Sequence, residues 1–96
     1  MKKVVQDLLI LFGSRAKGTA RADSDWDVAV VADHPLTLKE RGMAAEAVAR
    51  LLGVNEDQID VTDIWSASPL LQQLVAKEGT LLAGDPFAFT RFKIIA

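Results

Sequence analysis

Apolar residues along this chain gather in short runs separated by stretches with helical spacing. The segments 7–12 and 26–32 are almost continuously apolar, and Gly13 ends the first of them. The segment 59–64 alternates apolar and polar residues, and 80–83 is a short apolar run. Runs of this length are typical of strands, whether buried on both faces or on one. We therefore expect a sheet of about four strands.

Two other stretches have the periodicity of helices. Thr37 to Glu40 form a capping box, and Gly53 is a natural C-terminal stop. The apolar stripe between these signals consists of Leu38, Ala45, Val48, Ala49 and Leu52. A second helix is predicted from Ser68-Pro69 to Gly79. Its apolar residues are Leu70, Leu71, Leu74 and Val75. The pattern predicts an α/β (α+β) fold, in which a small mixed sheet is flanked by two to three helices.

The last segment, Phe87 to Ile95, carries three Phe and two Ile after the turn at 84–86. Such a segment either folds back on the core or leaves an apolar patch for another chain. The fold-back is favoured, because a small domain has uncovered sheet to fill. An exposed patch would instead serve a helical partner or a second copy in a homodimer.

The chemistry of the chain is concentrated in Gly13-Ser14 and, ten residues later, Asp25-Trp26-Asp27. Glycine lets the backbone approach a phosphate closely, while serine offers a hydroxyl and the following turn offers N–H groups. Asp25 and Asp27 are two residues apart on a strand, so both carboxylates leave the same face. A phosphate cradle next to paired carboxylates is typical of sites that handle metal-bound nucleoside triphosphates.

A third carboxylate on a neighbouring strand would complete a site for two Mg²⁺ ions about 3.5 to 4 Å apart. Asp60 and Asp63 are the candidates, and they face opposite ways on a regular strand because they are three residues apart. Asp60 is favoured, since Ile59 and Val61 form the apolar face against it. Without a cation the three carboxylates would repel one another.

Composition adds few constraints. The chain has 96 residues, half of them apolar, and a net charge of −2, which predicts a single domain spanning residues 1–96. There is no cysteine, no signal peptide and no apolar run near ~18 residues, so we expect a cytoplasmic protein without membrane contact. Positive charge is concentrated in 1–22, which favours binding of a polyphosphate over an extended nucleic acid.

Three segments carry a resemblance to a known family. They are Phe12-Gly13-Ser14-Arg15-Ala16-Lys17-Gly18, Asp23-Ser24-Asp25-Trp26-Asp27 and Asp60-Val61-Thr62-Asp63-Ile64, and the similarity continues through 68–71 and 77–82. Together they resemble the minimal nucleotidyltransferases (MNT) of the DNA polymerase β superfamily. The resemblance implies transfer of AMP from ATP to a hydroxyl with Mg²⁺. Many family members are antitoxins paired with a helical HEPN ribonuclease toxin, and some adenylylate that toxin.

The resemblance also implies roles for single residues. Gly13 and Ser14 match positions on the triphosphate, and Lys17 matches a basic position that commonly meets a phosphate. Arg15 fills a variable position and is a weaker nucleotide-binding candidate. The aspartates that match the catalytic and metal-binding positions are Asp25, Asp27 and Asp60. Trp26 departs from the family pattern, in which a small aliphatic residue usually separates the two aspartates.

Three functions remain open on sequence alone. The first is a protein adenylyltransferase, which the complete set of aspartates favours. The second is an antitoxin or interaction module without catalysis, which masks its partner by binding. The third is transfer to a small molecule or an RNA end, which ranks lowest because no residues here are available for a second, acceptor-holding domain.

Overall fold

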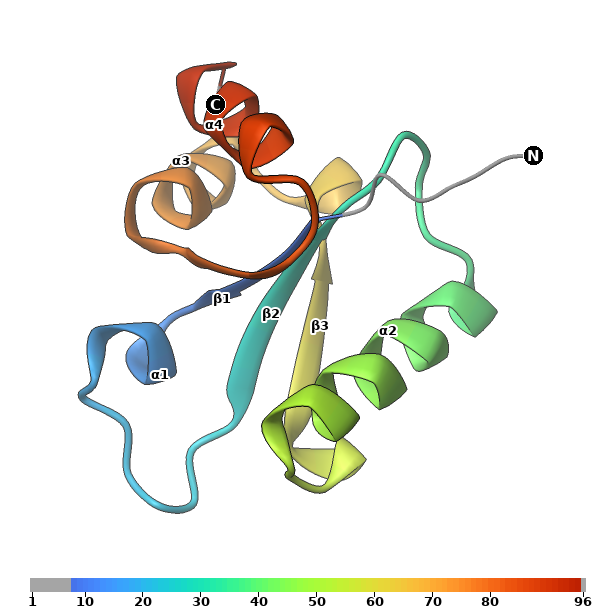
Figure 1. Cartoon of the computed structure of the whole chain (residues 1–96), viewed down its shortest axis with the longest axis vertical. Coiled ribbons are helices and arrows are strands. Elements are labelled where there is room, and N and C mark those ends of the chain that lie inside the picture. The colour runs from blue at the N-terminus through green and yellow to red at the C-terminus, as the bar shows by residue number, and fades with distance from the viewer. Residues whose placement is uncertain (1–7, 96) are drawn as a thin grey trace.

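A four-stranded mixed sheet with the order β3-β2-β1-β4 forms the centre of the computed structural model, which describes residues 8–95 (Figure 1). Its strands are β1 (Leu8–Phe12), β2 (Trp26–Val31), β3 (Ile59–Asp63) and β4 (Thr80–Ala83). Strand β1 runs antiparallel to β2 and to β4, whereas β2 and β3 are parallel. The predicted four strands are confirmed. Strand β2 ends one residue earlier than expected, and Asp7, where the first strand was expected to begin, lies outside the described residues.

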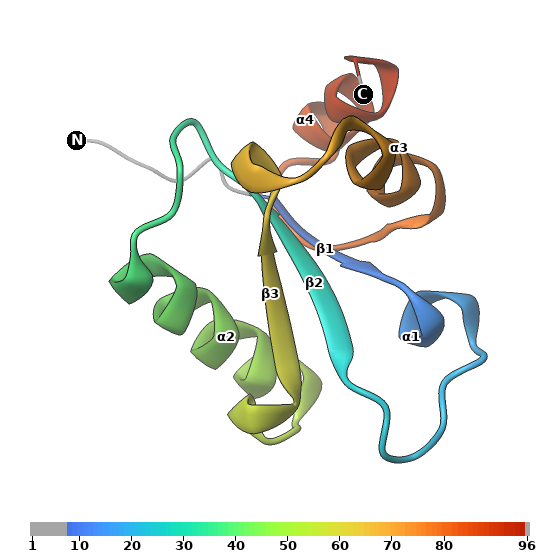
Figure 2. The ribbon, with the colours of Figure 1, turned by 180° about the vertical axis from the view of Figure 1, so that it is seen from behind.

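Helices cover both faces of the sheet. They are α1 (Ser14–Lys17), α2 (Leu38–Leu52), α3 (Pro69–Glu78) and α4 (Pro86–Ile95), and the short 3-10 turns are η1 (Glu56–Gln58) and η2 (Ile64–Ser66). Helix α2 lies on one side of the strands, and α3 and α4 lie together on the other (Figures 1 and 2). The fold is therefore the predicted mixed α/β arrangement, with the single turn α1 and the C-terminal α4 bringing the described helices to four.

The core consists of two apolar clusters, one on each face of the sheet. Leu11 and Val28 pack with Val48 of α2 on one face. On the other face, Ile10 and Ala29 belong to a cluster that receives side chains from α3 and α4. Because successive residues of β1 and β2 point to opposite faces, each strand must be apolar at almost every position. This explains the continuous runs in the sequence.

Both predicted helices begin and end at the expected residues. The Thr37 hydroxyl accepts from the Glu40 backbone N–H, and the Glu40 carboxylate accepts from the Thr37 N–H, which completes the capping box of α2. Gly53 closes this helix in the left-handed conformation. The assignment of Leu38 to the core stripe is wrong, because its side chain is 87% exposed. It belongs to the first turn of α2, which lies away from the strands (Figures 1 and 2).

The C-terminal segment combines the two expectations for it. Phe89 and Phe92 of α4 pack against the core cluster, as the fold-back requires. Phe87, Ile94 and Ile95 are each more than three-quarters exposed and form the apolar outer side of the same helix. Within residues 8–95, no helix has the length and apolar character needed to cross a bilayer.

Candidate active site

The turn between β1 and α1 places Gly13 beside Asp27. Gly13 has a φ of 77°, a conformation that side-chain-bearing residues rarely adopt. A Cβ atom at this position would lie 2.5 Å from the Asp27 Oδ2 atom. The Gly13 carbonyl accepts from the N–H groups of Ala16 and Lys17, which closes the turn of α1. Glycine is thus required here both for the backbone angle and for the approach of the carboxylate.

The sheet register brings Asp60 to Asp27. In the parallel pair of β2 and β3, Asp27 lies opposite Asp60, so both side chains leave the same face. Asp25 precedes β2 and is exposed, while Asp27 is half-buried. The three aspartates named from the sequence therefore occupy one end of two adjacent strands.

Asp63 has a different environment. It lies opposite Val30, and its side chain is buried, with 3% exposure. One carboxylate oxygen accepts from the Leu36 N–H at 2.9 Å and the other from the Trp65 N–H at 3.0 Å. Both oxygens thus bind backbone donors, which gives Asp63 a structural role at the far end of β3.

The carboxylates repel one another as the side chains stand. Burial raises the pKa of Asp27 above its ordinary value, and the charges of Asp60 and then Asp25 raise it further. A cation at this position would remove that repulsion. The oxygen donors of Asp25, Asp27 and Asp60 fit Mg²⁺, which takes one or two carboxylates plus substrate phosphates. In the part of the chain that the structure describes, no three acidic or imidazole side chains are already gathered closely enough to enclose an ion. The three carboxylates would hold a metal together with the phosphates of a bound nucleotide.

Lys17 points from α1 toward helix α3. Its Nζ atom lies 3.1 Å from the Glu78 Oε1 atom, and the lysine side chain is about half exposed. Glu78 was not singled out from the sequence. The only available signal was its position in the segment 77–82 of the resemblance, because the ion pair forms only when α3 packs beside α1.

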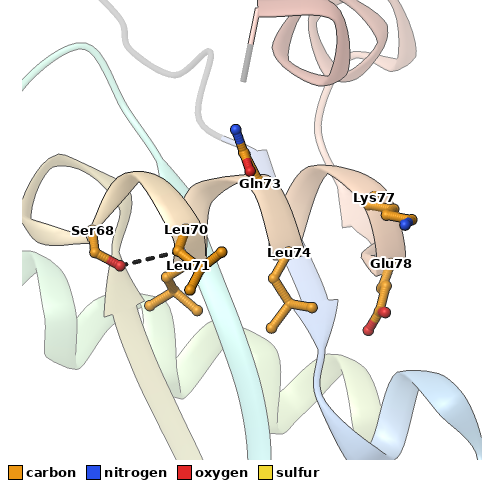
Figure 3. A pocket seen from close by; sticks show the side chains of 7 residues that line it. All are labelled: Ser68, Leu70, Leu71, Gln73, Leu74, Lys77 and Glu78. Carbon is orange, nitrogen blue, oxygen red and sulfur yellow. Dashed lines mark hydrogen bonds between the residues drawn. The ribbon is translucent and has the colours of Figure 1, made fainter.

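A groove of about 550 Å³ runs along α3 to this ion pair. Leu71, Leu74 and Glu78 project from the same side of the helix, whereas Gln73 points the opposite way (Figure 3). The groove is lined by Ser68, Leu70, Leu71, Gln73, Leu74, Lys77 and Glu78. An apolar surface therefore leads to Glu78, which pairs with Lys17 of the α1 turn that begins at Ser14.

Arg15 is directed toward the loop before β2. Its Nη2 atom donates to the backbone carbonyls of Ala22 and Ser24, and its guanidinium stacks on Trp26. The guanidinium of Arg15 is thus engaged within the protein. Its role in nucleotide binding, expected from the sequence, stays a prediction.

Comparison with known proteins supports the interpretation of this geometry. Residues 2–86 match the family described as "Polymerase beta, Nucleotidyltransferase". A protein adenylyltransferase MntA from Aphanizomenon flos-aquae is 37% identical over 86 residues, and one from Shewanella oneidensis is 38% identical over 77 residues. The alignments cover 82% and 80% of this chain. The chain spans little more than half the length of these curated relatives, 57% and 53% respectively.

Solved structures share the fold. A crystal structure of a toxin–antitoxin with AMP-PNP matches with a TM-score of 0.73 and 32% identity, covering 96% of this chain and 73% of that one. A tri-AMPylated Shewanella oneidensis HEPN toxin in complex with its MNT antitoxin matches with a TM-score of 0.64 and 29% identity, covering 96% and 69%. The fold, the carboxylates beside the Gly13 turn and these similarities agree: the chain belongs to the polymerase beta nucleotidyltransferase family.

Proposed function

We propose that this chain is a Mg²⁺-dependent adenylyltransferase that moves AMP from ATP to a hydroxyl of a partner protein. The observation that carries the proposal is the position of Asp27 between the Gly13 turn and Asp60. The backbone turn at Gly13, which a phosphate can approach closely, then lies next to the carboxylates that would bind the metal. The similarity to MntA adenylyltransferases and to a structure with AMP-PNP supports ATP as the donor.

The residues divide the work of binding and positioning. Gly13 and Ser14 hold the triphosphate through backbone N–H groups and a hydroxyl, and Lys17 exchanges Glu78 for a phosphate oxygen. Asp25, Asp27 and Asp60 would hold the Mg²⁺ ions, two in number, which would supply positive charge against the departing pyrophosphate. The acceptor oxygen forms a bond to the α-phosphorus as the bond to the bridging oxygen breaks, and pyrophosphate leaves with that electron pair. The exposed Asp60 carboxylate would take the hydroxyl proton.

The proposed partner is a helical HEPN ribonuclease toxin, and this chain is its antitoxin. The structural relatives include a HEPN toxin modified by AMP in complex with an MNT antitoxin. The exposed Phe87, Ile94 and Ile95 of α4 provide an apolar surface for such a partner. A homodimer is the second arrangement that this surface supports. The proposal includes one nucleotidyltransferase domain over residues 1–96 and a cytoplasmic location, where ATP is available.

Intact-mass analysis of a candidate HEPN-type partner tests the function. The partner is incubated with this chain, ATP and Mg²⁺, and in parallel with the Asp25→Ala/Asp27→Ala double variant. We expect a mass gain in AMP units with the wild type and none with the variant. Co-elution of the two proteins without any mass gain would replace catalysis by a binding-only antitoxin. Absence of both reaction and binding would overturn the partner assignment.

A further inference from the structure

The guanidinium of Arg15 makes three contacts at once. Its Nη2 atom donates to the Ser24 carbonyl at 2.9 Å and to the Ala22 carbonyl at 3.2 Å. Its Cζ atom lies 4.3 Å from the centre of the Trp26 ring. One side chain therefore holds both the loop before β2 and the first residue of that strand.

These contacts join the two halves of the candidate active site. Arg15 directly follows Ser14, whereas Ser24 directly precedes Asp25. Trp26 lies between Asp25 and Asp27. Arg15, next to the phosphate-binding turn, thus contacts the start of the aspartate segment.

Trp26 is held from both sides. It packs against the core cluster of Leu11, Val28 and Val48, and the guanidinium of Arg15 covers its ring. The small aliphatic residue expected between the aspartates offers no ring on which a guanidinium can stack. The large side chain at this position therefore forms a pair with Arg15.

The remainder of the loop has its own local closure. The Ser24 hydroxyl accepts from the Arg21 N–H at 2.9 Å, and the Ser24 N–H donates to the Arg21 carbonyl at 3.0 Å. This turn shapes the loop but does not connect it to α1. Arg15 supplies the connection, and its planar fork can donate and stack in one geometry, which a lysine ammonium does not reproduce.

We propose that Arg15 is a positioning residue, which fixes Asp25 and Asp27 relative to the Gly13–Ser14 turn through Trp26 and the Ser24 carbonyl. This inference rests on the proposed function, because it concerns how the same carboxylates are presented to a metal-bound nucleotide. It predicts that Arg15 and Trp26 act as one unit.

A double-mutant cycle on nucleotide binding tests the pairing without the partner protein. Calorimetry measures the affinity of Mg²⁺–AMP-PNP for the wild type, Arg15→Lys, Trp26→Leu and the double variant. We expect each single variant to bind about tenfold more weakly and the double variant to bind no more weakly than either, because the two changes remove one shared interaction. Arg50→Lys, on the exposed side of α2, is the matched control and should bind as the wild type does.

Other outcomes of the double-mutant cycle would contradict the positioning role of Arg15. If Arg15 contacts phosphate, the losses from Arg15→Lys and Trp26→Leu multiply in the double variant, and this would overturn the positioning role. A purely structural role would lower the melting temperature and leave the affinity unchanged well below it. Failure of the wild type itself to bind Mg²⁺–AMP-PNP would instead remove the proposed function, on which the inference rests.

Fluorescence provides a second, nucleotide-free measurement. The chain has two tryptophans, so Trp26 is the only one in a Trp65→Phe background. Removal of the stacked guanidinium by Arg15→Gln should shift or brighten the Trp26 emission, and Arg50→Gln should not. An unchanged Trp26 spectrum in the Arg15→Gln variant would show that the two side chains are not stacked in solution, which would overturn the proposal.

Discussion

The two ends of strand β3 carry the same residue type in opposite environments. At one end, the exposed Asp60 lies opposite Asp27, and burial, followed by the charges of Asp60 and Asp25, raises the pKa of Asp27. At the other, Asp63 is buried and accepts one backbone N–H on each oxygen. Only two residues separate Asp60, whose charge repels that of Asp27, from Asp63, whose two oxygens both accept hydrogen bonds.

The difference separates function from stability. Asp63 connects β3 to the loop that leads into α2, and its removal would leave buried donors without acceptors. Asp60 adds negative charge beside Asp27, an arrangement that no stability argument requires. Like charges brought together in a folded chain point to a cation that binds between them.

The largest effect is expected from Asp60→Asn. Transfer of AMP to the partner should fall at least about a thousandfold, because in the proposed mechanism Asp60 helps to hold the metal ions and takes the hydroxyl proton. The stability of the variant should equal or exceed that of the wild type. Asp57→Asn, an exposed aspartate of η1, is the matched control. Single-turnover rates and urea denaturation measure the two properties, and near-normal transfer by Asp60→Asn would exclude it from the site.

The next effect concerns the other end of the strand. Asp63→Ala should lower the free energy of unfolding by about 2 to 6 kcal/mol, because two part-buried N–H groups lose their acceptors at about 1 to 3 kcal/mol each. Urea denaturation measures the loss, with the exposed Asp23→Ala as control. A loss within about 0.5 kcal/mol, the range of ordinary surface substitutions, would contradict the structural role.

A smaller, pH-dependent effect is expected at Asp27. A carboxyl whose pKa is raised on folding destabilises the folded state once it ionises. The wild type should therefore lose stability relative to Asp27→Asn as the pH rises from 3.8 through the raised pKa of Asp27. Below pH 3.8 the difference in stability between the two proteins should vanish. Above the raised pKa of Asp27, saturating Mg²⁺–AMP-PNP should abolish this difference.

Denaturation of both proteins between about pH 3.5 and about pH 8 measures this difference. Asp25→Asn is the graded comparison, since its charge is the smallest contributor to the raised pKa of Asp27. A difference that stays constant across the range would show that the aspartates do not repel one another.

The smallest effect belongs to the loop that Asp63 holds. When protonated, His34 donates to Asp33 from Nδ1 and to Glu40 from Nε2, which raises the pKa of His34 to about 9. The stabilisation is complete below pH 6.5 and is lost as the pH rises through about 9. His34 is the chain's single histidine, so its NMR titration is unambiguous. A midpoint at the ordinary 6.5 would show that these contacts are absent in solution.

Local signals in the sequence accounted for much of the fold. The apolar runs predicted the strands, and the Thr37 capping box and Gly53 predicted the bounds of α2. The odd spacing of Asp60 and Asp63 predicted that they face opposite ways, because side chains alternate along a strand. This spacing does not give the pairing register of the strands, and the position of Asp60 opposite Asp27 comes from the structure.

Contacts between distant elements could not be predicted from local signals in the sequence. The ion pair of Lys17 with Glu78 depends on how α3 packs beside α1. The contacts of Arg15 depend on the path of the loop before β2. Leu38 has a core-like side chain at a position with the right spacing, but at the start of its helix this side chain is exposed to solvent. The spacing of apolar residues predicts which face of a helix is buried, but it does not predict which turns of the helix contact the core.

Metal binding tests the contrast between the two ends of β3 most directly. Electron paramagnetic resonance would measure the affinity for Mn²⁺, in place of Mg²⁺, with AMP-PNP present, for the wild type, Asp27→Asn, Asp60→Asn and Asp57→Asn. We expect tight binding by the wild type and Asp57→Asn, and binding at least about tenfold weaker by the other two variants. Equal affinity in all four proteins would contradict a metal site at the Asp27–Asp60 end of the sheet.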